Sequence, residues 1–576
     1  MKSGYWTREF IVGLFHLITP YWNSEEKKSA RLYLAAIITL TIAAVYMTLL
    51  LNEWFNSFYS ALQNYDSGAV YSGLLRFTGL AFAHIAFAVY SYYLQQRLAL
   101  RWRKWMTKNY LAKWTGQQMY YRLEMFSQGT ADNPDQRISE DINLFTARTL
   151  SFMSGLLRSA TTIVCFIFVL WNLSEVLSFS AAGQEIHIYG YLVWTALAYS
   201  VLGTWITHKV GHRLVSLNYL QQKLEADFRF SMVRLRETAE SVAFYNGAAK
   251  EEAFLSNRFM TLLRNTLFII KKQKQLSWLT NSYAQIAIIF PFVVAVPRYL
   301  SQNISLGGLM QIANCFGKVQ DAMSYFVDVY ASLAEWQSCA ERLLSFDKHI
   351  EAIEKETEEK SGNLVREETP DRLRLTDITI SVPAMDENKR TREIISSASC
   401  SIKAGEHVIL KGPSGSGKST LLRTLAGFWP YVKGHISMPA PSEMMFIPQK
   451  PYIPMGTSAE AASYPLETAD KEILSPLLVE CGLSHLMEKT DTEADWSHIL
   501  SLGEQQKLAF VRVFLRKPKW VFLDEATSAM DEETEEKMYR LLTALPGTTV
   551  ISIGHRSTLD KWHDRVLRIE NGKLIG

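Results

Sequence analysis

The stretch from residue 412 to residue 420 has the residue types and spacing of a phosphate-binding loop. It fits the pattern G-x-x-x-x-G-K-[ST] without a mismatch. Glycines let backbone amides turn inward around a phosphate. Lys418 adds a cation near the β- and γ-phosphates, and the Ser419 hydroxyl can hold Mg²⁺. We predict that the nucleotide-binding residues here are Gly412, Pro413, Ser414, Gly415, Ser416, Gly417, Lys418, Ser419 and Thr420.

The sequence on both sides of this loop supports the interpretation. The apolar run 408–410 predicts a buried strand before the loop, and residues 421–426 predict a helix after it. The N-terminus of such a helix favours a bound anion. The alternative, an ordinary turn rich in glycine and serine, is disfavoured because further nucleotide-binding motifs follow at suitable spacing.

Polar residues follow later apolar runs of the same part of the chain. Asp524 ends the run that begins at Trp520 and would place a carboxylate beside Mg²⁺. The next residue, Glu525, could polarise a water that attacks the γ-phosphate. His555 could contact that phosphate, and Gln449 could sense the metal and the water from a mobile loop. We predict Glu525, His555 and Lys418 as catalytic residues, and Ser419, Gln449 and Asp524 as Mg²⁺ ligands.

Composition limits the kinds of protein that this chain can be. It has 576 residues, enough for two or three domains, and 48% are hydrophobic. A net charge of +3 gives no support for a general polyanion-binding role, and no nucleic-acid partner is expected. The five cysteines are scattered without a C-x-x-C pair, which argues against a disulfide framework or a zinc site. No cleavable signal peptide is expected.

The apolar stretches predict a membrane domain in the first part of the chain. A membrane helix needs about 20 mostly apolar residues. Residues 11–18 are too few, and they predict an interfacial helix, with a loop as the alternative. The last of the predicted spans is interrupted by charged residues. The six predicted spans are about residues 32–51, 74–94, 152–171, 189–207, 279–300 and 306–330.

Loop charges give an independent indication of topology. Residues 52–72 and 172–190 contain no Lys or Arg, whereas residues 97–148 and 207–275 are rich in both. Basic loops remain in the cytoplasm, so the N-terminus and the nucleotide-binding part are expected there too. We expect a membrane domain over residues 1–350, a linker over 351–371 and an ATP-binding domain over 372–576.

With these motifs in order, the chain resembles an ATP-binding cassette (ABC) transporter whose membrane and ATPase domains are fused. The resemblance covers essentially the full length. Residues 51–62 (LNEWFNSFYSAL) and 132–141 (DNPDQRISED) resemble a bacterial subgroup linked to uptake of peptide antibiotics, bleomycin and vitamin B12, related to peroxisomal fatty-acyl-CoA half-transporters. The resemblance implies a type IV, exporter-like fold: an α-helical six-span transmembrane domain followed by an α/β P-loop ATPase domain. It places residues 132–141 and 226–245 near the two coupling regions.

The resemblance also implies a homodimer, because the family sandwiches ATP between the phosphate loop of one ATPase domain and the signature sequence of another. The usual signature L-S-G-G-Q reads L-S-L-G-E at residues 500–504. Leu502 and Glu504 are therefore substituted, and a helix N-terminus at Ser501 and Gly503 could still bind the γ-phosphate. Ser501, Gly503, Glu504 and Gln449 complete the predicted ATP contacts. The aromatic residue that usually stacks on adenine is not evident, and residues 380–383 occupy its region.

The expected function is ATP-driven transport, with ATP and Mg²⁺ as cofactors, by a multi-pass protein in a bacterial inner membrane. The subgroup favours import of hydrophilic solutes such as peptides or cobalamin. Export, or transport of fatty-acyl chains or acyl-CoA, is the alternative. An alternative of another class is an ATP-gated channel or regulatory membrane subunit that does not pump.

Overall fold

The computed structural model describes residues 7–126, 133–174, 177–181, 184–361, 364–383 and 391–576. The chain divides into two compact units. The first contains residues 1–119 and 127–348, and the second contains residues 120–126 and 349–576. Asp132, at the start of the motif 132–141, lies outside the described residues.

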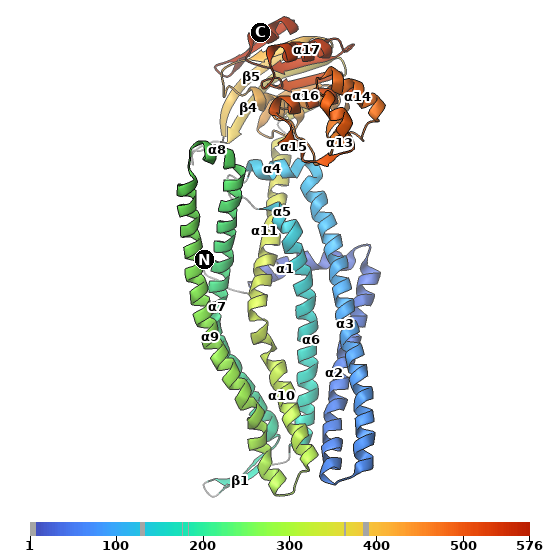
Figure 1. Cartoon of the computed structure of the whole chain (residues 1–576), viewed down its shortest axis with the longest axis vertical. Helices are drawn as coiled ribbons and strands as arrows, with labels where there is room; N and C mark the ends of the chain where they lie inside the picture. Colours follow the sequence, from blue (N-terminus) through green and yellow to red (C-terminus); the bar gives the residue numbers. More distant parts are fainter. Residues whose placement is uncertain (1–6, 127–132, 175–176, 182–183, 362–363, 384–390) are drawn as a thin grey trace. The chain divides into compact units, whose positions relative to one another are not determined.

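The first unit is built from long helices (Figure 1). A short amphipathic helix, α1, precedes them and includes residues 11–18, so this segment is a helix and not a loop. The helices of this unit include α1 (Arg8–Asn23), α2 (Lys27–Gln63), α3 (Ser67–Thr115), α6 (Ile142–Leu173), α7 (Tyr191–Glu237), α8 (Ala239–Phe244), α9 (Ala248–Leu300), α10 (Leu306–Asp328) and most of α11 (Tyr330–Ser361).

Helices lie over all six predicted spans, but the count of six is not confirmed. Four helical stretches of the described residues are long and apolar enough to cross a membrane: Lys27–Gln63, Ser67–Met125, Pro134–Leu173 and Ala248–Leu300. Helix α7 is not among them because its Tyr, Trp and Thr residues lower its mean hydropathy. Helix α10 carries Lys318 and Asp321, and the predicted sixth span is interrupted at Val329, between α10 and α11.

Two short strands were not predicted. The segment without Lys or Arg that precedes α7 contains β1 (Leu177–Ala181) and β2 (Gln184–Ile188), which pair antiparallel. The sequence showed this segment as a loop only, because its strands are short and a two-stranded ribbon gives a weak periodic signal.

Aromatic and amide side chains join α2 to its neighbours. Trp54 is buried, and its indole N–H donates to the Gly73 carbonyl oxygen of α3 at 2.7 Å. Its ring stacks on Phe58 with 4.6 Å between centroids. Asn56 Nδ2 donates to Gln311 Oε1 of α10 at 2.9 Å. Some of the aromatic residues after the first predicted span therefore pack at a contact between two helices.

The motif at residues 132–141 ends in a buried ion cluster. Arg137 Nη1 donates to Asp141 Oδ2 at 2.8 Å within the π-helical turn η2 (Arg137–Asp141). Arg342 Nε of α11 donates to the same oxygen at 2.9 Å. Because the Asp141 carboxylate is buried, the two guanidinium groups supply the countercharge that it needs there. The cluster joins the start of α6 to α11.

The described residues of the second unit form two larger sheets and a two-stranded ribbon, in which β9 (Gly456–Thr457) pairs antiparallel with β10 (Glu493–Ala494). A six-stranded sheet has the order β14-β13-β6-β12-β11-β8, and a four-stranded sheet has the order β3-β7-β4-β5. Strand β3 (Leu364–Glu368) lies within the expected linker 351–371 and pairs with β7 (Val432–Met438). The other strands are β4 (Arg372–Pro383), β5 (Thr391–Lys403), β6 (His407–Lys411), β8 (Met444–Ile447), β11 (Trp520–Asp524), β12 (Thr549–Ile553), β13 (Arg565–Glu570) and β14 (Lys573–Ile575).

Candidate active site

The predicted nucleotide-binding residues follow four neighbouring parallel strands. Strand β12 pairs in parallel with β6 and β11, and β11 pairs in parallel with β8. Carboxyl ends of parallel strands meet at one edge of the sheet, which is where ligands bind in open α/β sheets. The phosphate loop follows β6, Gln449 follows β8, Glu525 follows β11 and His555 follows β12.

The phosphate loop has the backbone that its glycines allow. Gly412, Gly415 and Gly417 have φ values of 156°, 77° and 98°. A side chain at Gly412 would also meet the Ile569 carbonyl oxygen, 2.8 Å from its Cβ position. Helix α12 (Lys418–Ala426) starts directly after Gly417, so its first amides face the loop.

Two observations fit this loop to a nucleotide. Lys418 Nζ donates to the carbonyl oxygens of Gly412 and Pro413 at 2.8 and 2.9 Å. Burial lowers the pKa of Lys418, while Glu525 and Asp524 oppose the shift. The Ser416 hydroxyl is buried and makes no hydrogen bond among the described residues. A buried hydroxyl without a partner is costly, and a bound phosphate group would satisfy it.

A hollow of about 390 Å³ lies beside the loop, and sequence reasoning missed most of its lining. Arg392, Glu393 and Ser396 come from β5, and Asn571 comes from the turn between β13 and β14. No motif marks these residues, because they reach the loop only through strand pairing. The loop contributes Pro413, Ser414, Gly415 and Ser416 to the same hollow.

Two of the predicted metal ligands touch each other. Ser419 Oγ donates to Asp524 Oδ1 at 3.1 Å. Burial raises the pKa of Asp524, against the hydrogen bond from Ser419. One carboxylate and one hydroxyl suit Mg²⁺, which usually takes few protein ligands and completes its shell with water and phosphate oxygens. The third predicted ligand, Gln449, bonds elsewhere.

Glu525 lies between the predicted catalytic residue His555 and the predicted Mg²⁺ ligand Gln449. His555 Nε2 lies 3.0 Å from Glu525 Oε1, and Gln449 Nε2 donates to Glu525 Oε2 at 3.1 Å. Glu525 has a φ of 47°, an uncommon value for a residue other than glycine. Its amide donates to the Ile553 carbonyl oxygen at 3.0 Å, which fixes this turn. The arrangement can orient a carboxylate toward a water next to the phosphate loop.

Gln506 is a further residue of the site that sequence reasoning did not assign. Its side chain is fully buried, and Nε2 donates to the Gln449 carbonyl oxygen at 2.9 Å and to Ser528 Oγ at 3.2 Å. The Ala529 amide donates to Gln506 Oε1 at 3.0 Å. Gln506 therefore ties the Gln449 loop to the turn after Glu525. The available sequence signal was the pair of glutamines after the L-S-L-G-E stretch, of which Gln506 is the second.

The signature residues lie at the start of α16 (Leu502–Arg516). The Glu504 amide donates to Ser501 Oγ at 3.4 Å, and the Ser501 amide donates to Glu504 Oε2 at 2.9 Å, which makes a capping box. A Cβ at Gly503 would lie 2.8 Å from the Ala529 carbonyl oxygen. Among the residues that the structure describes, the side-chain bonds of Ser501 run to Glu504 and not to the phosphate loop of its own chain.

Comparison with known proteins decides the family. Residues 16–300 match the family model described as ABC transporter transmembrane region 2, and residues 395–528 match the model described as ABC transporter. The inner membrane ABC transporter ATP-binding protein YddA of Escherichia coli is 33% identical over 95% of this chain and 96% of its own length. This chain belongs to the ABC transporter family. The expected resemblance is confirmed.

Other relatives place this ABC transporter near the D family. ABC transporter D family member 2 of Arabidopsis thaliana is 32% identical over 96% of this chain and 85% of its own length. The mouse lysosomal cobalamin transporter ABCD4 is 31% identical over 82% of this chain and 81% of its own length. These matches confirm an ATP-hydrolysing transporter subunit that uses ATP and Mg²⁺.

A solved structure agrees on the fold of the ABC transporter. A bacterial Atm1-family ABC exporter with ATP bound matches with a TM-score of 0.73, covering 95% of each chain. At 18% identity this match shows the fold alone. The exporter-like architecture, a helical membrane domain with an ABC ATPase domain, is therefore confirmed.

One membrane-loop helix packs on the ATPase domain of the transporter. Residues 120–126 of α4 (Met119–Phe126) group with the ATPase unit. The Tyr121 ring meets the Phe428 ring edge-on at 4.9 Å, and Met125 packs against the core of the ATPase domain. The contacting residues precede the coupling region expected at 132–141.

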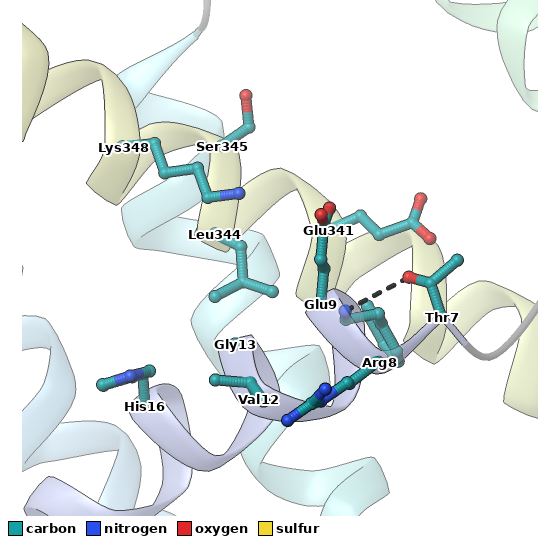
Figure 2. Close-up of a pocket in the computed structure, with 11 residues that line it drawn as sticks. Thr7, Arg8, Glu9, Val12, Gly13, His16, Glu341, Leu344, Ser345 and Lys348 are labelled. Carbon is teal, nitrogen blue, oxygen red and sulfur yellow. Dashed lines mark hydrogen bonds between the residues drawn. The ribbon is translucent and has the colours of Figure 1, made fainter.

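A second hollow of the transporter lies within the membrane unit, between α1 and α11 (Figure 2). Its volume is about 630 Å³. Charges of both signs line it: Arg8 and Glu9 from α1, and Glu341 and Lys348 from α11. The Phe10 amide donates to Thr7 Oγ1 at 3.2 Å and caps α1 there. Acids and bases offset each other, so the hollow does not select an anion or a cation by charge.

Proposed function

We propose that this chain forms a homodimeric half-transporter that hydrolyses ATP to import hydrophilic solutes, such as peptides or cobalamin. The observation that carries the hydrolytic part is the position of Glu525 between His555 and Gln449 beside the phosphate loop. Cobalamin as the solute is supported by the lysosomal cobalamin transporter named among the relatives, and import by the subgroup resemblance of residues 51–62 and 132–141.

In this proposal each side chain has one task. Lys418 and the loop amides bind the phosphates, and Ser419 and Asp524 hold Mg²⁺, which offsets phosphate charge. Gln449 donates to the Glu525 carboxylate and would hold it toward the attacking water. Glu525 accepts a hydrogen bond from that water and polarises it, and His555 orients Glu525 and the γ-phosphate.

A second protomer supplies the signature contact. Because the hydrogen bonds of Ser501 stay within its own helix start, we infer that Ser501 and Gly503 bind the γ-phosphate on the phosphate loop of a partner copy. Glu504 supports this contact from the capping box. The long basic segments 97–148 and 207–275 support six spans with a cytoplasmic ATPase domain and N-terminus. The inner membrane relative of Escherichia coli supports a bacterial inner membrane as the location.

The first test replaces Glu525 with Gln in the full-length protein in lipid nanodiscs. We expect ATP to remain bound and turnover to fall by at least about a hundredfold, because the amide cannot act as a base. Glu532→Gln, at an exposed residue of α17 (Glu532–Thr543), is the matched control and should keep wild-type turnover. Wild-type turnover by Glu525→Gln would refute the base assignment.

The direction of transport and the class of solute are tested with the protein in membrane vesicles. ATPase stimulation in proteoliposomes by cobalamin, by peptides or by acyl-CoA separates the solute classes. Loss of uptake by right-side-out vesicles on Lys418→Ala supports import, whereas accumulation inside inside-out vesicles shows export. An ATP-gated channel would instead pass solute down its gradient without concentrating it. The retained Glu525 and His555 argue against that non-pumping role.

A further inference from the structure

The signature helix carries an acidic residue where the family usually has glutamine. Ser501 Oγ donates to Glu504 Oε2 at 2.8 Å, and the Ser501 amide donates to the same oxygen at 2.9 Å. The hydroxyl that should donate to a γ-phosphate is therefore directed at a carboxylate. That carboxylate also adds a negative charge at a site where phosphate must approach, and like charges at such short range repel.

The second carboxylate oxygen has a different partner. His485 Nε2 lies 3.4 Å from Glu504 Oε1. His485 belongs to the 3-10 turn η4 (Ser484–Lys489), which precedes the signature helix in the chain. Its side chain is 49% exposed and that of Glu504 is 30% exposed, so solvent reaches both groups. The imidazole thus contacts the carboxylate oxygen that accepts no hydrogen bond from Ser501.

We propose that His485 is a positioning residue for the signature segment: it holds the Glu504 carboxylate, and its protonated form offsets the carboxylate charge when the partner's nucleotide docks. The inference rests on the proposed homodimer, because the phosphate comes from the other copy. Protonated His485 also draws Glu504 toward itself, which frees the Ser501 hydroxyl to donate to phosphate.

The Glu504 carboxylate keeps its negative charge in this cluster. Burial raises the pKa of Glu504, but hydrogen bonds from Ser501 and the charges of His485 and Lys507 outweigh it, so the pKa lies below its usual value. Lys507, on the same helix, is the other basic residue whose charge lowers the pKa of Glu504. Glu504 stays ionised between pH 6 and pH 8. A change in ATP affinity that arises at this cluster must then come from the imidazole.

The experiment compares ATPase kinetics of the full-length protein in nanodiscs between pH 6 and pH 8. The variants are His485→Gln, Glu504→Gln and the double variant. We expect the wild-type KM for ATP to rise about threefold with pH, the effect of one charge at a partly exposed site. His485→Gln should remove this rise. Adding it to Glu504→Gln should change nothing further, since the charge to be offset is gone.

Two further variants separate positioning from folding. His485→Lys keeps a positive charge at every pH used and should hold KM at its low-pH value. His498→Gln, on the neighbouring helix α15 (Trp496–Ile499), alters a histidine that is 84% exposed and should keep the wild-type profile. His485→Gln retains a donor at a half-exposed position, so loss of folding is not expected.

The inference is overturned if the wild-type KM does not change with pH. It is also overturned if His485→Gln retains the rise, or if the two substitutions act additively. Failure of the proposed function looks different: the wild type would then lack ATP hydrolysis that depends on Lys418. Normal hydrolysis together with an unaltered pH profile in His485→Gln refutes only the role of His485.

Discussion

Ser419 and Asp524, 105 positions apart in the chain, are joined by a hydrogen bond of 3.1 Å at the edge of the ATPase sheet. The hydroxyl comes from the first turn of α12 and the carboxylate from the end of β11. Strand pairing through β12 brings these two chain segments together. The pair presents two hard oxygen atoms to one point, which is the chemistry of a Mg²⁺ site.

The first prediction follows from this pair. Asp524→Asn should raise the Mg²⁺ concentration for half-maximal ATPase activity at least about tenfold, because a neutral amide oxygen binds a hard divalent ion much more weakly than a carboxylate. ATPase assays over a Mg²⁺ titration measure this value. Asp470→Asn, at an exposed residue before α14 (Lys471–Glu480), is the control. An unchanged Mg²⁺ requirement in Asp524→Asn would remove Asp524 from the metal site.

The second prediction concerns the close approach of α2 and α10. A Cβ added at Gly307 would overlap the Asn56 carbonyl oxygen and Ser60 Oγ, whereas one at Gly317 of the same helix meets nothing within 4 Å. Gly307→Ala should therefore cost about 1–3 kcal/mol of stability, as overpacking does. Thermal unfolding in detergent should show a lower midpoint for Gly307→Ala, and Gly317→Ala should match the wild type. Equal midpoints for both variants would contradict the close packing.

The third prediction concerns α4. Tyr121→Ala removes the ring that meets Phe428 and should weaken the attachment of this loop helix to the ATPase domain by about 1 kcal/mol. We expect solute transport to fall more than basal ATP hydrolysis, because motion of the ATPase domain no longer reaches the loop. Both rates are measured in the same proteoliposomes. Tyr120→Ala, at the exposed neighbouring position, should leave the ratio of the two rates unchanged.

The fourth prediction is a pH dependence of stability. His563 Nε2 accepts from Ser552 Oγ, and Nδ1 donates to the Leu559 carbonyl oxygen, both at 2.8 Å. Burial lowers the pKa of His563 in the folded domain. In the unfolded chain it titrates near its usual value of about 6.5. As the pH falls below that value, the unfolded chain takes up a proton that the folded domain does not, so stability decreases.

The measurement is the unfolding midpoint of the detergent-solubilised protein at pH 7.5 and at pH 5.5. His563→Gln should lower the midpoint less on acidification than the wild type does, because glutamine takes up no proton. His498→Gln serves as the exposed control and should keep the wild-type slope. If His563→Gln showed the full wild-type slope, His563 would not contribute to acid sensitivity.

The sequence alone determined the chemistry of the nucleotide site. The glycine spacing of the nine-residue loop predicts the roles of Lys418 and Ser419. The polar residues at the end of an apolar run predict those of Asp524 and Glu525. Such motifs are local: each needs one strand end and the next few residues. The long apolar runs likewise indicated a membrane protein, because no other use of about 20 consecutive apolar residues is common.

Only the tertiary structure decided which distant residues act together. Strand pairing brings Arg392 and Asn571 to the phosphate loop, and helix packing sets Gly307 against Asn56. The contact between His485 and Glu504 likewise depends on how one turn folds over a helix start. Sequence periodicity indicates which face of a helix or strand is apolar. Which other helix or strand covers that face depends on packing between elements far apart in the chain. That is why the residues of the loop were predictable and its surroundings were not.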